Sequence, residues 1–292
     1  MTAVVIGNLD GVHLGHRALI DTAKATGANV QALTFEPHPR QYFAPEKEGF
    51  RLSSPEQKIK LLNRFGIDQV HAVGFDDDFA KMTAKEFARD LLVGQLEASH
   101  VIIGEDFRFG RGREGTVDIL TELGLSLGFQ THIVPTLRDD SGMPYSSTRV
   151  RAALSRANFS AATSLLGHPW IFNGTIFKGQ QLGRTIGMPT ANIELGDYQR
   201  IPYGIYALWV GLGDETPARP AVGYIGHRPT VGGEEEWFEA HLFDFDEDIY
   251  GVNLNVQPVK FLRGDQKFDG LEPMMAQMQI DLSQARLALG SQ

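Results

Sequence analysis

The sequence predicts an α/β fold in which a parallel sheet with helices is followed by a small antiparallel β-barrel and a final helix. In residues 2–154, short apolar runs alternate with longer stretches of helical period, as in strand–helix–strand units. From residue 170 onward, glycine and proline are frequent and apolar residues alternate with polar ones, which is typical of antiparallel strands. We therefore expect two domains, residues 1–167 and residues 168–292.

The parallel sheet is expected to contain five strands with helices between them. The apolar runs that predict strands are residues 3–6, 30–34, 69–73, 100–103 and 132–135. The stretches that predict helices are residues 17–26, 55–65, 84–96 and 117–127. Because sheets of this kind bind ligands at the carboxyl ends of their strands, the loops that follow these strands are the candidate sites.

The second half is expected to form a barrel, because several short strands follow one another closely. A helix is predicted before it at residues 161–166, and the predicted strands are residues 170–176, 204–210, 219–225, 237–243 and 254–261. The final stretch, residues 273–289, places apolar side chains at helical spacing. It predicts an amphipathic helix that packs on the barrel.

Composition excludes several classes of protein. Thirty-six acidic and 27 basic side chains give a net charge of −9, which argues against non-specific binding of nucleic acid. The absence of cysteine excludes disulfides, thiolate-bound metals and a cysteine nucleophile. The sequence has neither a run of about eighteen apolar residues nor a secretory signal at its start. We expect a cytoplasmic protein that binds no membrane, and the oligomeric state stays open.

The first predicted strand leads into residues 7–16, with the sequence GNLDGVHLGH, and a predicted helix follows. Glycines let the backbone approach a phosphate, and a helix start offers unpaired N–H groups. The alternative is that the two histidines are surface or capping residues. The segment resembles the HxGH nucleotidyltransferases, which implies a Rossmann-like domain whose histidines stabilise charge on the α-phosphorus of ATP. The candidate catalytic residues are His13 and His16, and the candidate ATP-binding residues are Gly7, Asp10, Gly11 and Gly15.

A second motif, residues 146–151 with the sequence SSTRVR, precedes another predicted helix. Hydroxyl groups at such a position can cap the helix or bind phosphate, and arginine can hold a departing pyrophosphate with paired donors. Alone, the motif would be a helix cap. Together with the histidine segment it predicts a nucleotide clamp, with Ser146, Ser147, Thr148 and Arg151 as candidate ATP-binding residues.

Two further segments at strand ends concern the acceptor of the nucleotide, namely residues 34–39 (TFEPHP) and 104–110 (GEDFRFG). Phenylalanines there can wall a flat ring, although they can also be core residues. The four motifs together resemble the FAD synthetase half of bacterial bifunctional riboflavin kinase/FAD synthetases, with leucine at residue 9 where that family usually has phenylalanine. The resemblance implies that the acceptor is FMN. The candidate flavin-binding residues are Phe35, His38, Asp106, Phe107 and Phe109.

In the second half, residues 183–192 read GRTIGMPTAN. Thr190 and Asn192 are two positions apart, so in an extended chain they face the same side and can share one Mg²⁺. The alternative is a polar turn. The flavokinase family carries the same G-x-P-T-A-N signature, and the resemblance implies that Gly187 and Pro189 bind ATP and that Glu239 is the general base. Two departures from that family are the loop at residues 177–184 and the tyrosine at residue 224, where asparagine is common.

Together the resemblances imply a bifunctional enzyme of flavin cofactor synthesis. Its substrates and products would be ATP, riboflavin, FMN and FAD, with Mg²⁺ accompanying ATP. The enzyme would phosphorylate riboflavin and then join FMN to AMP, releasing pyrophosphate. Two alternatives remain open at this point: a flavin-binding regulator whose kinase half has degenerated, and a protein with FAD synthetase activity only. A nucleotidyltransferase for a different acceptor is disfavoured by the attached barrel.

Overall fold

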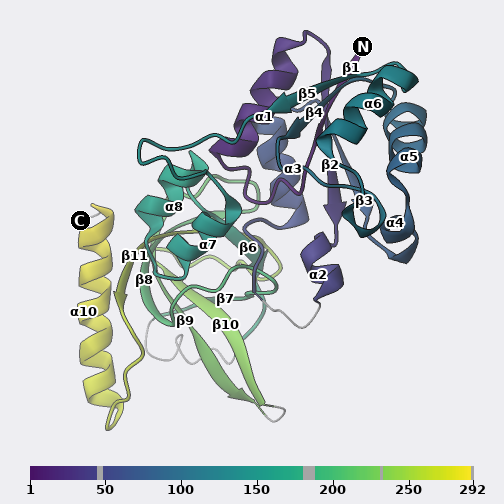
Figure 1. Ribbon diagram of the computed structural model, residues 1–292. Coiled ribbons are helices and arrows are strands. Elements are labelled where there is room, and N and C mark those ends of the chain that lie inside the picture. Colours follow the sequence, from purple (N-terminus) through teal and green to yellow (C-terminus); the bar gives the residue numbers. More distant parts are fainter. Residues whose placement is uncertain (45–48, 180–187, 231–232, 291–292) are drawn as a thin grey trace. The chain divides into compact units, whose positions relative to one another are not determined.

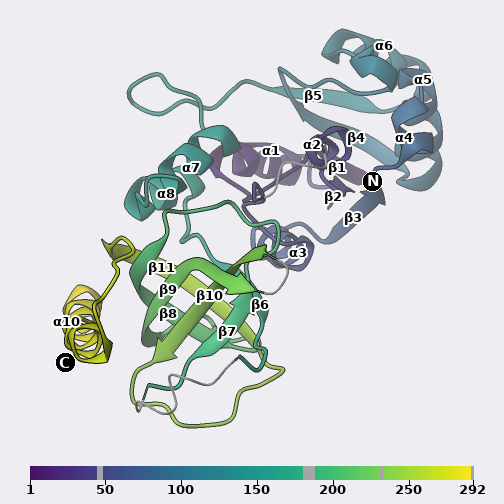
Figure 2. The same ribbon diagram turned by 90° about the horizontal axis from the view of Figure 1, so that it is seen from below.

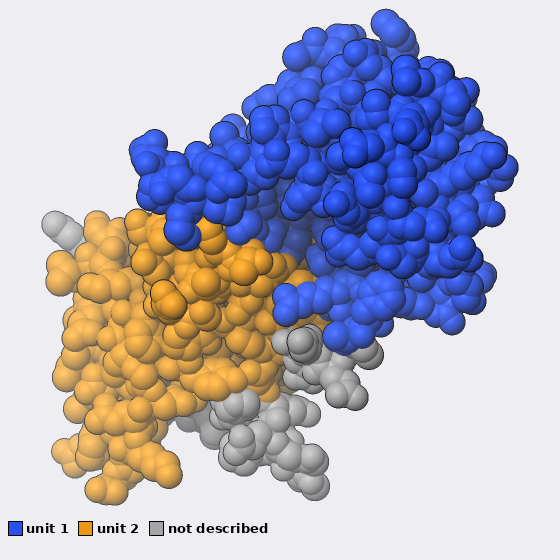
Figure 3. All heavy atoms as spheres, viewed as in Figure 1, with its two compact units in different colours: residues 1–48, 55–147 blue, residues 49–54, 148–292 orange. Residues whose placement is uncertain are grey.

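The computed structural model describes residues 1–44, 49–179, 188–230 and 233–290 of the 292-residue chain (Figure 1). The chain divides into two compact units (Figure 3). The first contains residues 1–48 and 55–147, and the second contains residues 49–54 and 148–292. The short segment 49–54 therefore belongs to the second unit although both of its flanks belong to the first.

A five-stranded parallel sheet forms the centre of the first unit, as the sequence predicts. Its strands are β1 (Thr2–Ile6), β2 (Asn29–Glu36), β3 (Gln69–Gly74), β4 (Ala98–Gly104) and β5 (Gln130–Val134). They lie in the order β3-β2-β1-β4-β5. The chain thus builds outward from β1 in one direction and then in the other, which makes the carboxyl ends of β1 and β4 the topological switch point where ligands bind in such sheets.

Helices cover both faces of this sheet. Buried residues of α1 and α3 pack with Ala3 and Val5 on one face, and those of η1 and α6 pack with Val4 and Ile6 on the other. The elements are α1 (Leu14–Ala25), α2 (Pro39–Phe43), α3 (Pro55–Arg64), α4 (Asp77–Lys81), α5 (Ala84–Glu86), η1 (Phe87–Gln95), η2 (Arg111–Arg113) and α6 (Val117–Leu127).

The predicted helix 84–96 differs from the structure in its winding. A capping box between Thr83 and Glu86 starts α5, and the chain then continues as the π-helix η1. The backbone N–H of Leu96 donates to the carbonyl oxygen of Leu91, which is the i to i+5 pattern of a π-helix. The apolar pattern therefore predicted the extent of this helical segment but not its wider turn.

The second unit is an antiparallel barrel of six strands (Figure 2). Its interior holds large buried side chains, among them Phe172, Tyr206 and Phe238. The strands lie in the order β6-β11-β8-β9-β10-β7, and β6 and β7 at the two ends of this order also contact each other. Their bounds are β6 (Phe172–Thr175), β7 (Ala191–Glu194), β8 (Gly204–Leu212), β9 (Arg219–Thr230), β10 (Gly233–Leu242) and β11 (Asn253–Arg263).

Among its described residues the second unit also contains the helices α8 (Phe159–Leu166) and α10 (Leu271–Leu289), and nearly all of α7 (Ser147–Leu154), whose first residue belongs to the first unit. As predicted, the final helix packs on the barrel, where α10 contacts β8, β9 and β11 (Figure 2). The guanidinium of Arg263 on β11 holds the buried carboxylate of Asp281 on α10 with two parallel bonds, of 2.9 and 2.7 Å. Within the described residues, every helix is too short or too polar to span a bilayer.

Candidate functional sites

The two histidines of the first motif lie together at the start of α1. His13 is the N-cap residue of this helix, and its Nδ1 accepts a hydrogen bond of 3.3 Å from the backbone N–H of His16. The two imidazole rings stack, with centroids 3.6 Å apart and planes inclined by 20°. The structure therefore brings both rings to one face of a helix N-terminus, where the helix dipole favours an anion.

The loop before α1 has an unusual backbone. Gly11 has a φ of +76°, and two residues with side chains, Leu9 and Val12, also have positive φ values of +51° and +41°. For a β-branched residue such as Val12 this conformation is strained. Leu9 and Val12 are both buried in the core of the first unit. This packing holds the loop in its strained conformation.

Gly15 is the other glycine that the geometry requires. A Cβ atom at this position would lie 3.0 Å from Cε1 and 3.1 Å from Nδ1 of His13. Gly7 is different, because a Cβ there would meet only the side chain of Leu9, at an ordinary 3.4 Å. The absence of a side chain at residue 15 thus gives the ring of His13 its place beside the helix.

The second motif reaches the histidine loop through one hydroxyl. Oγ of Ser147 donates a hydrogen bond of 3.1 Å to the backbone carbonyl of Asp10, which is itself buried. Ser146 and Ser147 belong to the first compact unit, and Thr148, which is exposed, begins the second. The structure therefore joins Asp10 and Ser147, two predicted ATP-binding residues from opposite ends of the unit.

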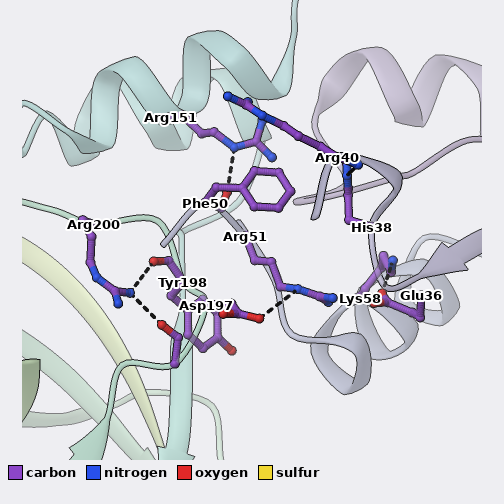
Figure 4. Close-up of polar contacts among 11 residues, drawn as sticks. Glu36, His38, Arg40, Phe50, Arg51, Lys58, Arg151, Asp197, Tyr198 and Arg200 are labelled. Atoms are coloured by element: carbon purple, nitrogen blue, oxygen red, sulfur yellow. Dashed lines mark hydrogen bonds and ion pairs between the residues drawn. The ribbon is translucent and has the colours of Figure 1, made fainter. Parts of the chain in front are cut away.

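Arg151, from the same motif, belongs to the second unit and contacts the segment 49–54 (Figure 4). Its Nε donates a hydrogen bond of 2.7 Å to the carbonyl of Phe50, and its guanidinium lies 4.6 Å from the centre of the phenylalanine ring. The backbone N–H groups of Phe50 and Arg51 donate in turn to the carbonyl of Asp197. These contacts hold the guanidinium in place, and its predicted role on pyrophosphate stays a prediction.

The predicted flavin-binding residues occupy different surroundings. Phe35 and Phe109 are buried in the core of the first unit, while Phe107 is half-buried and stacks on Phe109 with ring centroids 5.5 Å apart. His38 caps α2, where its Nδ1 accepts from the backbone N–H of Arg40. Asp106 is exposed. Their role in binding flavin stays a prediction, with Phe107, His38 and Asp106 more accessible than the other two.

In the barrel, strand pairing brings the predicted base beside the predicted metal ligand. Glu239 on β10 lies directly opposite Asn192 on β7, and on its other side it lies opposite Tyr224 on β9. Directly paired residues share one face of a sheet. The buried side chains of Phe238 and Ile193 occupy the opposite, inner face, so the row of Asn192, Glu239 and Tyr224 lies on the outside of the barrel.

Tyr224 adds a neutral phenol to this row. Its hydroxyl bonds to Asp265, and burial followed by this bond raises the pKa of Tyr224 to about 12. Its ring lies over Gly226, where a Cβ would be 2.0 Å from the tyrosine hydroxyl. The residue that departs from the flavokinase pattern therefore stands immediately beside the predicted base and remains protonated at neutral pH.

A cavity of about 270 Å³ adjoins the PTAN segment. Pro189 and Thr190 line it together with the loop 245–250, which contributes three acidic residues. The carbonyl of Pro189 accepts a hydrogen bond of 2.9 Å from Nδ1 of His241. The structure thus places Pro189 and Thr190 at a hollow, whereas Gly187 lies outside the described residues, as does most of the loop 177–184.

The side chain of Asn192 is held in a way that suits a hard cation. It is buried, and its Nδ2 donates a hydrogen bond of 3.3 Å to the backbone carbonyl of Thr190, which leaves Oδ1 as the oxygen for a cation. Gly179 lies against this amide, since a Cβ there would be 2.9 Å from Nδ2. The described residues contain no cluster of three or more histidine and carboxylate side chains suited to a metal. The oxygens of Thr190 and Asn192, with phosphate oxygens, nevertheless fit the preference of Mg²⁺.

Comparison with known proteins gives two matches along the chain. Residues 1–149 match the family model for FAD synthetase, and residues 166–289 match the family model for riboflavin kinase. A protein of Escherichia coli strain K12 named bifunctional riboflavin kinase/FMN adenylyltransferase is 41% identical over 292 residues, which cover 98% of this chain and 92% of that protein. The chain belongs to the bifunctional riboflavin kinase/FMN adenylyltransferase family.

More distant relatives cover similar shares of their lengths. The family member from Bacillus subtilis strain 168 is 31% identical over 293 residues, covering 97% of this chain and 91% of its own. A crystal structure titled as a macrolide-efflux protein from Streptococcus pneumoniae has a TM-score of 0.83 and 31% identity, and covers 98% of this chain and 93% of that one. The chain therefore shares its fold with that structure along nearly its whole length.

One charged residue of the FAD synthetase half was not among the sequence predictions. Lys58 on α3 is 4% exposed and pairs with Glu36 of the TFEPHP segment, with 2.6 Å between Nζ and Oε1 (Figure 4). A sequence signal for it exists, because Lys58 precedes the buried Leu62 by four residues and so lies on the apolar face of the helix. A lysine on such a face is rarely buried without a specific partner.

Proposed function

We propose that the protein makes FAD from riboflavin in two ATP-dependent steps, at the barrel site and then at the histidine site. The observation that carries this proposal is that one chain combines both family domains with the geometry each reaction needs. Glu239, the proposed base, lies opposite Asn192, the proposed cation ligand, in the barrel, and paired imidazoles lie at a helix N-terminus in the first unit. The domains assigned to these activities are residues 168–292 and 1–167.

In the kinase step, Glu239 is the general base. Its carboxylate takes the proton of the 5′-hydroxyl of the ribityl chain while the hydroxyl oxygen bonds to the γ-phosphorus of ATP. The bond between the γ-phosphorus and the bridging oxygen of ADP breaks, so FMN and ADP are the products. The direct pairing of Glu239 with Asn192 supports this role, because the proton acceptor and the phosphate site must adjoin.

Mg²⁺ would be held by the oxygens of Thr190 and Asn192 together with phosphate oxygens of the nucleotide. Its contribution is to neutralise charge on the transferring phosphate. The chain's own contribution is orientation: the bond from Nδ2 of Asn192 to the carbonyl of Thr190 fixes the amide, and the cavity beside Pro189 and Thr190 offers space for the nucleotide.

In the adenylyl transfer, a phosphate oxygen of FMN bonds to the α-phosphorus of ATP and the bond to the bridging oxygen of pyrophosphate breaks. The FMN phosphate is already ionised, so no general base is needed. His13 and His16 donate hydrogen bonds to the phosphoryl oxygens as charge develops on them. Pyrophosphate would be stabilised by Arg151 and by the hydroxyls of Ser146, Ser147 and Thr148.

Two single substitutions test the separation of the sites. His16→Ala is expected to lower FAD formation from FMN by about 10²–10³-fold while FMN formation from riboflavin continues. Glu239→Gln is expected to lower FMN formation by about 10²–10⁴-fold while supplied FMN is still converted to FAD. Products are separated by chromatography after incubation with ATP and MgCl₂. If either variant loses both activities equally, the two-site proposal is wrong.

The proposal extends to the setting of the enzyme. The net charge of −9 supports small-molecule partners rather than nucleic acid, since a negative chain is repelled by a phosphate backbone. The lack of cysteine is compatible with a reducing compartment. We therefore propose a cytoplasmic enzyme whose partners are ATP and the flavins, and fractionation of cells that produce the protein tests its location.

A further inference from the structure

A buried ammonium group lies beneath the loops of the FAD synthetase site. Nζ of Lys58 contacts three oxygens: Oε1 of Glu36 at 2.6 Å, Oγ1 of Thr34 at 3.1 Å and the backbone carbonyl of Asn8 at 3.4 Å. An ammonium has three hydrogens to donate, and these three oxygens match that number. Oγ1 of Thr34 also donates to the carbonyl of Asn8, at 3.0 Å.

These oxygens connect two segments that carry the predicted site residues. Asn8 follows β1 and immediately precedes the positive-φ residue Leu9 in the loop that leads to the histidines. Glu36 ends β2 and precedes the turn in which His38 caps α2. Lys58 comes from a third element, α3. One side chain thus joins the nucleotide loop to the acceptor segment.

A role in stability alone explains this arrangement poorly. A buried ion pair contributes little net stability compared with apolar side chains of the same size, because both charges must leave water. Apolar packing is available on this face of α3, because Leu62, one turn after Lys58, is fully buried. The charged group is found where the strained loop meets the acceptor segment, at the end of the sheet where such folds bind ligands.

We propose that Lys58 is a positioning residue for the adenylyl transfer: by fixing the carbonyl of Asn8 and the carboxylate of Glu36, it holds the nucleotide loop and the acceptor segment in register. The inference rests on the proposed FAD synthetase activity of this half. Lys58 itself need not contact either substrate. Its effect passes through the loop whose amides and histidines face the phosphates, so it acts on the rate of transfer more than on the binding of substrates.

The test compares Lys58→Met with Lys58→Arg and with Lys24→Met as a matched control. Lys24 is in the same half, near the C-terminal end of α1, and its side chain is 45% exposed. Lys58→Met is expected to lower kcat for FAD formation from FMN by about 10–100-fold, with smaller changes in KM for FMN and ATP. Lys58→Arg, which keeps the charge, is expected to recover part of the loss, and Lys24→Met to behave as wild type.

Thr34→Val provides a second route that leaves both charges in place: it removes the hydroxyl that donates to the carbonyl of Asn8 and accepts from Nζ of Lys58. It is expected to lower the same kcat by a few-fold. The riboflavin kinase activity of each preparation reports on folding of the chain and is expected to be unchanged. A wild-type kcat in Lys58→Met, or equal losses of both activities in Lys58→Met and Thr34→Val, would overturn the inference. Absence of FAD formation in the wild type would instead refute the proposed function.

Discussion

Gly15 offers a sharp test of the histidine site, because stability and activity should respond differently when it gains a methyl group. In Gly15→Ala the new Cβ would lie 3.0 Å from Cε1 and 3.1 Å from Nδ1 of His13, and 3.3 Å from the carbonyl oxygen of Tyr145. Ordinary contacts of this kind are several tenths of an ångström longer. Since the backbone carbonyl is held by the fold, the imidazole ring of His13 must give way.

The size of the effect follows from this displacement. A misplacement of 1 Å in a catalytic site can cost about 10²-fold in rate, so a shift of roughly half that distance should lower kcat for FAD formation about tenfold. Residue 15 is in the first turn of α1, where alanine is preferred to glycine by up to about 1 kcal/mol. That preference offsets the crowding, and the melting temperature is expected to stay within a few degrees of wild type.

The assay measures FAD formation from FMN, riboflavin kinase activity and thermal melting on the same preparation. Gly74→Ala is the control, because Gly74 ends β3 in the same unit and a Cβ there would meet no atom within 4 Å. FAD formation should fall in Gly15→Ala alone, while the kinase activity stays constant in both variants. Equal FAD formation by the two variants would refute the reasoning that the ring of His13 depends on the missing side chain.

Two further predictions concern the barrel and the effect of pH. Gly179→Ala places a Cβ 2.9 Å from Nδ2 of Asn192, so kinase activity should fall about tenfold and need more MgCl₂ while FAD formation persists; an unchanged Mg²⁺ titration would contradict this. Burial and then the nearby His100 lower the pKa of His132, so the folded state disfavours the proton and stability should be full above about pH 6.5 and fall below it. His132→Gln should reduce that fall in melting temperature, and an identical pH profile would contradict it.

The sequence predicted the architecture well because its signals were local. Each of the five parallel strands is a short segment rich in apolar residues, and α6 begins at Val117 and ends at Leu127 as expected. The five-residue helices α2 and α4 escaped prediction because fewer than two turns cannot show a helical period. The strand β7 was read only as an extended segment, since four residues that include Asn192 carry little alternation.

The site predictions also depend on whether the residues of a site are close together or far apart in sequence. His13 and His16 are near in sequence and at a helix start, so their shared face follows from helix geometry alone. The adjacency of Glu239 and Asn192 depends on the register of two strands far apart in sequence, which the motifs imply only by resemblance. Lys58 was missed because its partners Thr34 and Glu36 come from another element, and only the position of a lysine on an apolar helix face indicated it.

The segment 49–54 shows why a domain boundary in such a chain is not a single point. Nε1 of Trp170 donates a hydrogen bond of 2.9 Å to the carbonyl of Leu52, and Phe50 bonds both to Asp197 and to Arg151. These bonds make six residues of the first half a structural part of the second unit. Because Arg151 was assigned to the histidine site by its sequence motif, the group predicted to stabilise pyrophosphate is held by a segment that folds with the kinase barrel. Phe50, which belongs to neither set of motifs, is therefore part of the surroundings that position Arg151.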